Sequence, residues 1–232
     1  MTEALVVIPA FNESHHLYPI LRCIRSLPDV SALVVDDGST DHTARVARSQ
    51  YAECIRHTRN HGYGGAVATG LSYALEQGYQ YCVTIDADGQ HDPGLIPRFV
   101  GALRDNDAVC GTRYHPNAVY QTGIPKDTRI IHDEVRHFFC RLTESDSSDP
   151  FCGFRAYCAS LIKRAMPTEP GYGAGLQILC QAMKLDARIA EVPIDVVYRQ
   201  EDIRKHLKFS AVHRGTRNVV KYFNELVANE LL

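Results

Sequence analysis

Short apolar runs alternate with helical patterns through the first half of the chain, and each run ends in polar or glycine-rich residues. The first run, ALVVIPA at residues 4–10, precedes apolar residues at helical spacing: Leu17, Ile20, Leu21 and Ile24. The alternation continues with strand patterns at 31–37, 53–57, 81–88 and 107–112, and with helical patterns at 39–50, at 64–78 and from Pro93. Apolar strands separated by helices predict a mostly parallel sheet covered by helices on both faces.

The second half of the chain is less regular. Residues 113–125 contain Pro, Gly, Asn and Tyr without periodicity, which predicts a long loop. We expect a helix at 127–144, a strand at 188–194 and an amphipathic helix at 210–232.

No repeat or low-complexity linker divides the sequence. We therefore expect a single domain over residues 1–232. Its nucleotide-binding half would span about 1–113, its acceptor-side half about 114–209, and the terminal helix about 210–232.

Composition and charge exclude several classes of protein. The 232 residues are 45% hydrophobic and carry 25 Lys and Arg against 27 Asp and Glu, so nothing indicates a nucleic-acid-binding polycation. The eight cysteines include no C-x-x-C pair, and several fall in apolar runs. The N-terminus lacks the basic start of a signal peptide, and no apolar run is long enough to cross a bilayer. We expect a reduced, cytoplasmic protein without a transmembrane segment.

The terminal helical pattern has an apolar stripe that includes Val219, Phe223 and Leu226, with Arg217 and Lys221 nearby. Such a stripe packs against its own domain, forms a homodimer contact, or lies on the inner face of an anionic membrane as a peripheral contact. The pattern favours packing and leaves the other two open.

The stretch VTIDADGQHDP, residues 83–93, runs from an apolar strand straight into three carboxylates. If the strand continues, Asp86 and Asp88 point to the same side and repel each other unless a cation neutralises them. Oxygen ligands suit Mg²⁺ or Mn²⁺, and the amide oxygen of Gln90 could be a third ligand. The alternative is a turn at Asp88-Gly89 with the acids in solvent, and the motif alone leaves both open.

Other phosphate-binding and catalytic motifs are missing. HGYGGAVATG, residues 61–70, looks like a dinucleotide fingerprint, but Val67 stands where the third glycine belongs. The chain has neither a G-x-x-x-x-G-K-[ST] loop nor a G-x-S-x-G elbow. In open parallel sheets, ligands bind at the carboxyl ends of the strands. The polar segments there would suit a polyanion with a divalent cation.

Seven segments in order, VVIPAFNE, VVDDGSTDHT, NHGYGGAVATGLSYA, DADGQHDP, GTR, DPFCGFRAY and EVPIDVVYR, resemble the family-two glycosyltransferases. They are most similar to the branch of dolichol-phosphate mannose synthase and polyprenyl-phosphate sugar transferases. The resemblance covers about Leu5 to Lys205. It implies an α/β, single-domain GT-A fold, which is Rossmann-like with a mostly parallel sheet.

The resemblance also implies a nucleotide site. Pro9, Phe11 and Glu13 would cup the base, although Phe11 stands where the synthases usually have Tyr. Val35 and Asp37 would hold base and ribose.

The same resemblance implies a metal and phosphate site. The residues matching the metal and diphosphate motif are Asp86, Ala87, Asp88 and Gln90. Arg113, Arg199 and Lys205 would bind phosphates of donor or acceptor.

Two departures from the family pattern affect these expectations. The segment RQEDIRK has Asp202 and Arg204 where the synthases usually have Gly and Ser, so a solvated charged loop is the alternative there. Gln177 occupies the position where family members with hydroxyl acceptors commonly carry a carboxylate base, and an amide cannot accept a proton as a base. Asp149 is the remaining candidate base, with a turn-capping role as its alternative.

A phosphate acceptor is already anionic and needs no base, so Gln177 favours a phosphorylated lipid or small-molecule acceptor, with polyprenyl phosphate as one candidate. The resulting prediction is a metal-dependent, inverting hexosyltransferase that uses a nucleotide-sugar donor of the GDP-mannose or UDP-glucose type. The alternatives are a transferase with a soluble hydroxyl acceptor, a non-catalytic nucleotide-sugar-binding protein, and a nucleotidyltransferase. The last would need a lysine in its N-terminal loop, and IPAFNESHH has none.

Overall fold

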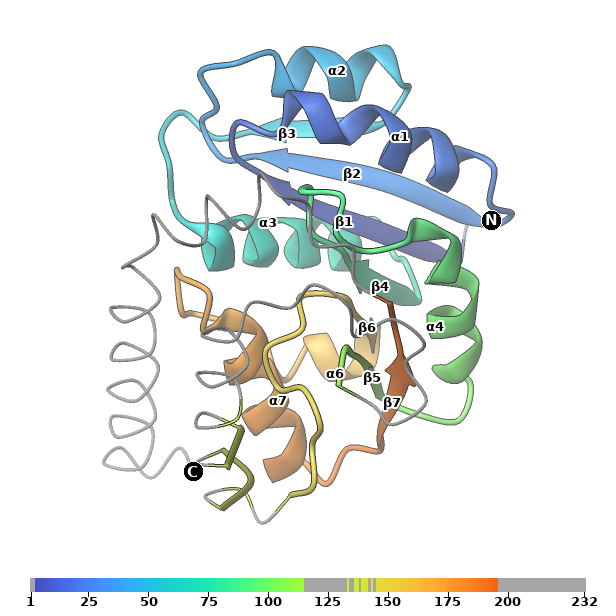
Figure 1. Ribbon diagram of the computed structural model, residues 1–232, viewed down its shortest axis with the longest axis vertical. Helices are drawn as coiled ribbons and strands as arrows, with labels where there is room; N and C mark the ends of the chain where they lie inside the picture. The colour runs from blue at the N-terminus through green and yellow to red at the C-terminus, as the bar shows by residue number, and fades with distance from the viewer. Residues whose placement is uncertain are drawn as a thin grey trace.

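The computed structural model describes residues 3–114, 133, 136–137, 139–141, 143 and 145–195. The strands of these segments are β1 (Ala4–Ala10), β2 (Val30–Asp36), β3 (Glu53–Arg56), β4 (Tyr81–Thr84), β5 (Ala108–Thr112), β6 (Arg155–Cys158) and β7 (Ile189–Pro193). The helices are α1 (Ser14–Arg25), α2 (Thr43–Ser49), α3 (Tyr63–Glu76), the 3₁₀ turn η1 (Pro93–Leu95), α4 (Ile96–Ala102), α6 (Ala159–Ile162) and α7 (Ala174–Lys184). Figure 1 shows their arrangement.

Several predictions fall outside the described residues. These are most of the loop expected at 113–125, most of the helix expected at 127–144, and the terminal helix at 210–232. Arg199 and Lys205 lie outside them too.

The strands form one sheet in the order β3-β2-β1-β4-β6-β5-β7. Every neighbouring pair is parallel except the two pairs made by β6, which runs antiparallel to both β4 and β5. The predicted α/β class with a mostly parallel sheet is therefore confirmed. The position of β6 between β4 and β5 was not predicted, because the two strands that pair with it lie far away in sequence.

The sheet has an apolar core on each face. Side chains alternate along β1, so Val6 and Ile8 join the cluster under α1 and α4, while Leu5 and Val7 join the cluster under α3. All seven residues of β1 are buried. Because both faces are covered, β1 reads as a continuous apolar run rather than an alternating one.

The strand order places a topological switch point between β1 and β4. After β1 the chain adds β2 and β3 on one side, and β4 then pairs with the other side of β1, opposite Val7 at Thr84. In open α/β sheets the ligand crevice lies outside the carboxyl ends of the strands at such a point. The segments that follow β1 and β4 therefore border the crevice.

Helix α3 approaches β1 closely at Gly70, where a Cβ atom would overlap the buried side chain of Val7. We expect Gly70→Ala to lower the free energy of unfolding by about 1–3 kcal/mol through overpacking, despite the better helix propensity of Ala. Gly101 in α4 is the matched control, because a Cβ there meets no atom within 4 Å. Gly101→Ala should be neutral or stabilise by up to about 1 kcal/mol. Urea unfolding measures both, and equal effects would contradict the close approach.

Candidate active site

The segments that follow β1 and β2 are joined at the crevice. The backbone N–H of Asn12 donates to the Ser39 hydroxyl at 2.9 Å, and its side-chain oxygen accepts from the Thr40 N–H at 2.9 Å. Asn12 itself adopts φ +59°, a left-handed conformation that asparagine tolerates. This loop carries Phe11, which is 46% exposed, and Glu13, whose charge contributes to raising the pKa of Asp88 after β4. The three segments thus border one site.

Asp86 lies just after β4, with 28% of its side chain accessible. The Tyr63 hydroxyl donates to its Oδ1 at 3.0 Å. Gly153 packs against the carboxylate so closely that any Cβ there would overlap it. Burial raises the pKa of Asp86, while the Tyr63 hydrogen bond and the charges of Arg113 and Arg155 act to lower it. The carboxylate is therefore held at Oδ1, in a place that opposes its ionisation.

Asp88 forms the predicted turn. Its Oδ1 accepts from the Gln90 N–H at 2.9 Å, and Gly89 supplies φ +74°. Burial, followed by the charge of Asp86, raises the pKa of Asp88. The turn and the cation ligand are thus compatible roles, because the turn engages one carboxylate oxygen only. The metal-binding roles of Asp86, Asp88 and the Gln90 side chain remain predictions.

These acids fit a divalent cation. Their ligand atoms are carboxylate oxygens, which divalent cations such as Mg²⁺ prefer. Burial of both acids and the repulsion between them disfavour their ionised forms, and a bound cation would stabilise those forms. Within the described part of the chain, no three or more His, Cys, Asp and Glu side chains are grouped so that they could hold an ion. Oxygen atoms of a bound diphosphate would have to complete the coordination shell, as is usual for Mg²⁺.

Arg113, just after β5, is bound by Asp149. Its Nε and Nη2 donate to the Asp149 carboxylate at 2.6 and 2.8 Å, and its backbone N–H donates at 3.1 Å. Asp149 is fully buried. A carboxylate engaged on both oxygens by an arginine is a weak base, so the geometry favours a structural role for Asp149 over the predicted catalytic one. The charge of Arg113 still reaches Asp86.

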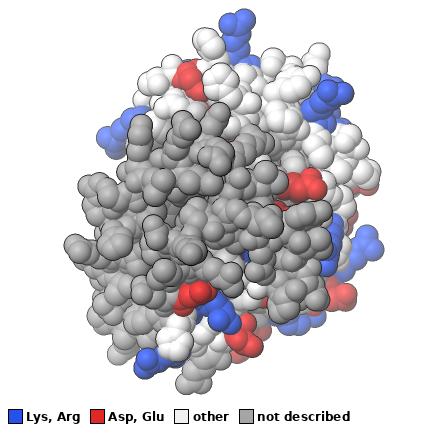
Figure 2. All heavy atoms as spheres, in the orientation of Figure 1, with Lys and Arg blue, Asp and Glu red and all other residues white. Residues whose placement is uncertain are grey.

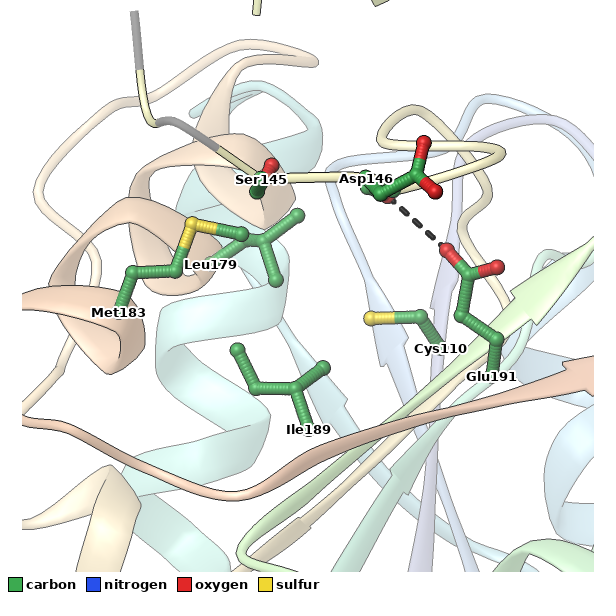
Figure 3. Close-up of a pocket in the computed structure, with 8 residues that line it drawn as sticks. Cys110, Ser145, Asp146, Leu179, Met183, Ile189 and Glu191 are labelled. Carbon is green, nitrogen blue, oxygen red and sulfur yellow. Dashed lines mark hydrogen bonds between the residues drawn. The ribbon is translucent and has the colours of Figure 1, made fainter. Parts of the chain in front are cut away.

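The loop that carries Asp149 is fixed by Glu191 of β7. The Glu191 carboxylate accepts from the Ser147 hydroxyl at 3.1 Å and from the Ser148 N–H at 2.7 Å. Figure 3 shows Glu191 beside this loop, at the edge of an apolar pocket of about 230 Å³ between α7 and the strands β5 and β7.

Arg155 of β6 is a second cation near Asp86, and sequence reasoning assigned it no role. It is 2% exposed, and its Nε donates to the Cys152 carbonyl at 2.7 Å. Its other guanidinium nitrogens donate to the carbonyls of Pro150 and Gly175. The sequence did contain a sign of this role, because Arg155 lies in the otherwise apolar segment of β6. A charged side chain buried in a strand needs dedicated hydrogen-bond partners.

The predicted nucleotide residues divide into two groups. Phe11 and Glu13 border the crevice, whereas the Val35 side chain is fully buried in the core beneath α3. Pro9, in β1, and Ala87, after β4, are also buried. A side-chain contact from Val35 to a nucleotide is therefore not favoured.

Asp37 is buried, and its carboxylate is bound by the loop that leads into α3. Its carboxylate accepts from His57 Nδ1 at 2.7 Å and from the backbone N–H groups of His61 and Gly62, each at 2.8 Å. These bonds fix the loop that leads into α3, and the His57 ring is held in addition by Thr69 at 3.0 Å. Asp37 thus acts on the site through this loop. Its direct contact with base or ribose remains a prediction.

A loop before α7 covers the start of α3. Pro170 accepts from the Gly64 N–H at 2.8 Å, and side chains at Gly62 or Gly64 would overlap the backbone of this loop. The glycines of HGYGG therefore permit a close backbone contact. Tyr172, on the same loop, stacks on Tyr63 with ring centroids 5.3 Å apart.

Tyr172 is 74% exposed and lies within electrostatic range of the acids. Its pKa is raised by partial desolvation and by the charges of Asp86, Asp88 and Glu13. The sequence offered no periodic signal for either tyrosine of the stacked pair, because the contact joins α3 to a distant loop.

Gln177 of α7 holds the same loop. Its Oε1 accepts from the N–H groups of Thr168 and Glu169 at 2.8 and 2.9 Å, and its Nε2 donates to the Thr168 hydroxyl at 2.9 Å. The side chain is buried and directed at the loop. Its amide is thus explained by backbone partners, and it carries less information about the acceptor than the sequence suggested.

Fold and site together define a glycosyltransferase of the GT-A type. Residues 5–166 match the family described as glycosyl transferase family 2, and the chain belongs to that family. The predicted family and enzyme class are confirmed.

Similar proteins include undecaprenyl-phosphate mannosyltransferase of Micrococcus luteus, which is 33% identical over 208 residues and aligns over 85% of each chain. Polyprenol monophosphomannose synthase of Mycolicibacterium smegmatis is 28% identical and aligns over 88% of this chain and 80% of its own. Glucosyl-3-phosphoglycerate synthase of Mycobacterium tuberculosis, solved with Mn²⁺, UDP-glucose and phosphoglyceric acid, superposes with a TM-score of 0.70 at 25% identity. That match covers 94% of this chain and 77% of the other.

Within the described segments, no helix combines the length and the apolar character that a membrane crossing requires. On the face shown in Figure 2, basic and acidic side chains of the described residues both occur around the rim.

The raised pKa of Asp88 predicts that this acid destabilises the metal-free protein at neutral pH. Asp88→Asn removes the charge but keeps the oxygen that accepts from Gln90, so we expect a Tm higher by a few degrees at pH 7. The gain should shrink as pH falls, because the folded wild-type protein then takes up the proton that its raised pKa favours. Mn²⁺ with nucleotide should raise the wild-type Tm more than that of the variant.

Asp92→Asn is the matched control for that measurement. Asp92 is exposed, and its Oδ1 accepts from the Gly94 N–H at 2.8 Å in a similar turn. This substitution should leave the Tm unchanged. A wild-type Tm equal to or above that of Asp88→Asn would contradict the electrostatic description of the site.

The Arg113–Asp149 pair gives a second stability prediction. Arg113→Gln or Asp149→Asn removes an ion pair that is largely withdrawn from solvent, so each should cost about 3–5 kcal/mol, and the double variant should cost clearly less than the sum. Urea unfolding measures this coupling. Arg188→Gln, which breaks the exposed 3.4 Å contact with Asp107, is the control and should cost at most about 1 kcal/mol. Additive losses at Arg113 and Asp149 would show that the pair is not coupled.

Proposed function

We propose that this glycosyltransferase moves a hexose from a nucleotide-sugar of the GDP-mannose or UDP-glucose type to a phosphorylated acceptor, for which polyprenyl phosphate is the preferred candidate. The observation that carries the proposal is the pair of desolvated carboxylates, Asp86 and Asp88, at the switch point of the sheet. Ionised carboxylates in such a place repel a diphosphate unless a cation lies between them. Mg²⁺ or Mn²⁺ bound there would offset the negative charge that develops on the leaving diphosphate.

The chain's own residues orient the donor side. Tyr63 holds Asp86 through its hydroxyl, and the turn at Gly89 holds Asp88. Phe11 offers an exposed aromatic face for the base, and Glu13 extends the acidic rim. Because Asp86 and Asp88 each accept a hydrogen bond before any ligand arrives, less reorganisation is needed at the moment of transfer.

Basic residues would steady the phosphates. Arg113 is held in place by Asp149 and lies within electrostatic range of Asp86. Arg199 and Lys205 would act from the segment beyond residue 195, in keeping with the preference of arginine for paired phosphate oxygens. The acceptor oxygen would then attack the anomeric carbon from the face opposite the diphosphate, in one displacement that inverts the configuration.

The acceptor class is supported by two relatives whose names specify undecaprenyl-phosphate and polyprenol monophosphomannose chemistry. An acceptor phosphate is ionised at neutral pH and needs no general base, which agrees with the engagement of Asp149 by Arg113 and of Gln177 by its loop. A hydroxyl acceptor on a small phosphorylated molecule is the second candidate. It is favoured by the fold shared with an enzyme solved with phosphoglyceric acid.

The test of this proposal supplies labelled GDP-mannose or UDP-glucose with Mn²⁺ and either a polyprenyl phosphate in detergent or phosphoglyceric acid. We expect a labelled product with the polyprenyl phosphate that releases its sugar in mild acid, because a glycosyl phosphate hydrolyses where an ordinary glycoside survives. A product with phosphoglyceric acid alone would move the assignment to the hydroxyl acceptor. Metal-dependent binding of nucleotide-sugar without transfer to any acceptor would indicate a binding protein.

Asp88→Asn should lower kcat in this assay by about 100-fold or more, because cation binding and leaving-group stabilisation fail together. Asp92→Asn, four residues further on and outside the site, should retain wild-type turnover. Near-wild-type turnover by Asp88→Asn would exclude the carboxylate pair as the cation site.

A further inference from the structure

We propose that His91 is a positioning residue for Asp86, whose carboxylate it fixes through an Nδ1–H donor when the cation and the nucleotide are bound. The inference rests on the proposed cation site, because its role is to orient one of that site's two carboxylates. His91 does not touch the reacting atoms in this proposal and acts only through Asp86.

The first observation is an unpartnered nitrogen. His91 is 6% exposed, and its Nδ1 makes no hydrogen bond to any residue that the structure describes. Buried ring nitrogens without partners are rare in folded proteins, because the lost hydration is not replaced. Such an atom in a site that a ligand enters indicates a bond that forms when the ligand binds.

The second observation is where this nitrogen points. Asp86 Oδ2 lies 3.8 Å from His91 Nδ1, just beyond hydrogen-bond range. A lone pair on Nδ1 facing a carboxylate oxygen would be repelled, so the tautomer with the proton on Nδ1 is favoured. A small rotation of the Asp86 carboxylate would then complete the bond.

The third observation is how the imidazole is fixed on its other sides. Its Nε2 lies 4.0 Å from the Cys152 sulfur, and the ring packs at a tilt on Phe154 with centroids 5.6 Å apart. A ring held in this way cannot readily turn Nδ1 toward another acceptor. The donor is therefore aimed at Asp86 before any ligand arrives.

Asp86 needs such a donor because its other contacts leave one oxygen unfixed. Tyr63 binds Oδ1, and Gly153 closes one side of the carboxylate. A metal-binding carboxylate is normally oriented by hydrogen bonds from outside the coordination shell, and loss of such a bond typically weakens metal binding about 10–100-fold. His91 is the group placed to supply that bond to Oδ2.

A purely structural histidine is the competing explanation, since His91 also fills space between Cys152 and Phe154. The two explanations differ in what His91 substitutions change. A space-filling role predicts lower stability with unchanged cation affinity. A positioning role predicts weaker cation binding in a protein that remains folded.

The test measures the Kd of Mn²⁺ by electron paramagnetic resonance titration in the presence of saturating UDP or GDP, with the Tm of each variant measured alongside. His91→Leu, which fills the space without a donor, should weaken Mn²⁺ binding about 10–100-fold. His91→Asn, whose amide places an N–H near the former Nδ1, should restore most of that affinity. Cys152→Ala, which removes the sulfur beside Nε2 but leaves the Nδ1 donor and the Phe154 contact in place, should weaken Mn²⁺ binding clearly less than His91→Leu does.

The inference is overturned if His91→Leu binds Mn²⁺ like the wild-type protein, or if Cys152→Ala weakens binding as much as His91→Leu does. Absence of Mn²⁺ binding by the wild-type protein would instead overturn the cation site, and with it this inference. If His91→Leu does not fold, ¹⁵N NMR of the wild-type imidazoles decides, with His91→Asn assigning the signal. An Nδ1–H tautomer whose resonance moves on addition of Mg²⁺ and nucleotide supports the role, and an Nε2–H tautomer overturns it.

Discussion

The carboxylates of Asp86 and Asp88 stand where burial and mutual repulsion both oppose their charge, and the rest of the site is arranged around that conflict. β4 ends beside β1 at the switch point, so the acids face the place where an α/β sheet binds its ligand. Tyr63 and Gly153 hold Asp86 in this position instead of allowing it to turn to solvent. The protein thus maintains a local destabilisation that a cation and a diphosphate would relieve together.

The two arginines near these acids are held by different means. Arg113 depends on the buried carboxylate of Asp149, whose loop is bound in turn by Glu191. Arg155 has carbonyl oxygens as its partners and enters the site because β6 is inserted between β4 and β5. Both lower the pKa of Asp86, but desolvation outweighs them. A positive potential therefore lies beside the acids without neutralising them.

Several residues act on the site through the backbone. Asp37 fixes the loop before α3, and Gln177 fixes the loop that carries Tyr172. Asp37 was predicted to hold base and ribose, and Gln177 was interpreted as favouring a phosphorylated acceptor. The side chains of both accept hydrogen bonds from backbone N–H groups. Asp88 combines the two roles that the sequence presented as alternatives, because its turn uses one oxygen of two. Polar side chains at such a rim are needed as much to hold irregular loops as to bind substrates.

The sequence by itself determined the strands β1 to β5 and β7, the parallel character of most of the sheet and the acidic segment at its carboxyl edge, because apolar periodicity and strand endings are local properties. Only the tertiary structure decided which distant residues form hydrogen bonds and ion pairs with one another. Asp149 meets Arg113 across 36 residues, and Tyr63 meets Asp86 across 23. The sequence did not predict β6 as the strand that pairs antiparallel with β4 and β5, because this pairing also joins segments that are distant in sequence. Periodicity indicates which face a residue presents, but which distant group lies opposite depends on the order of the strands.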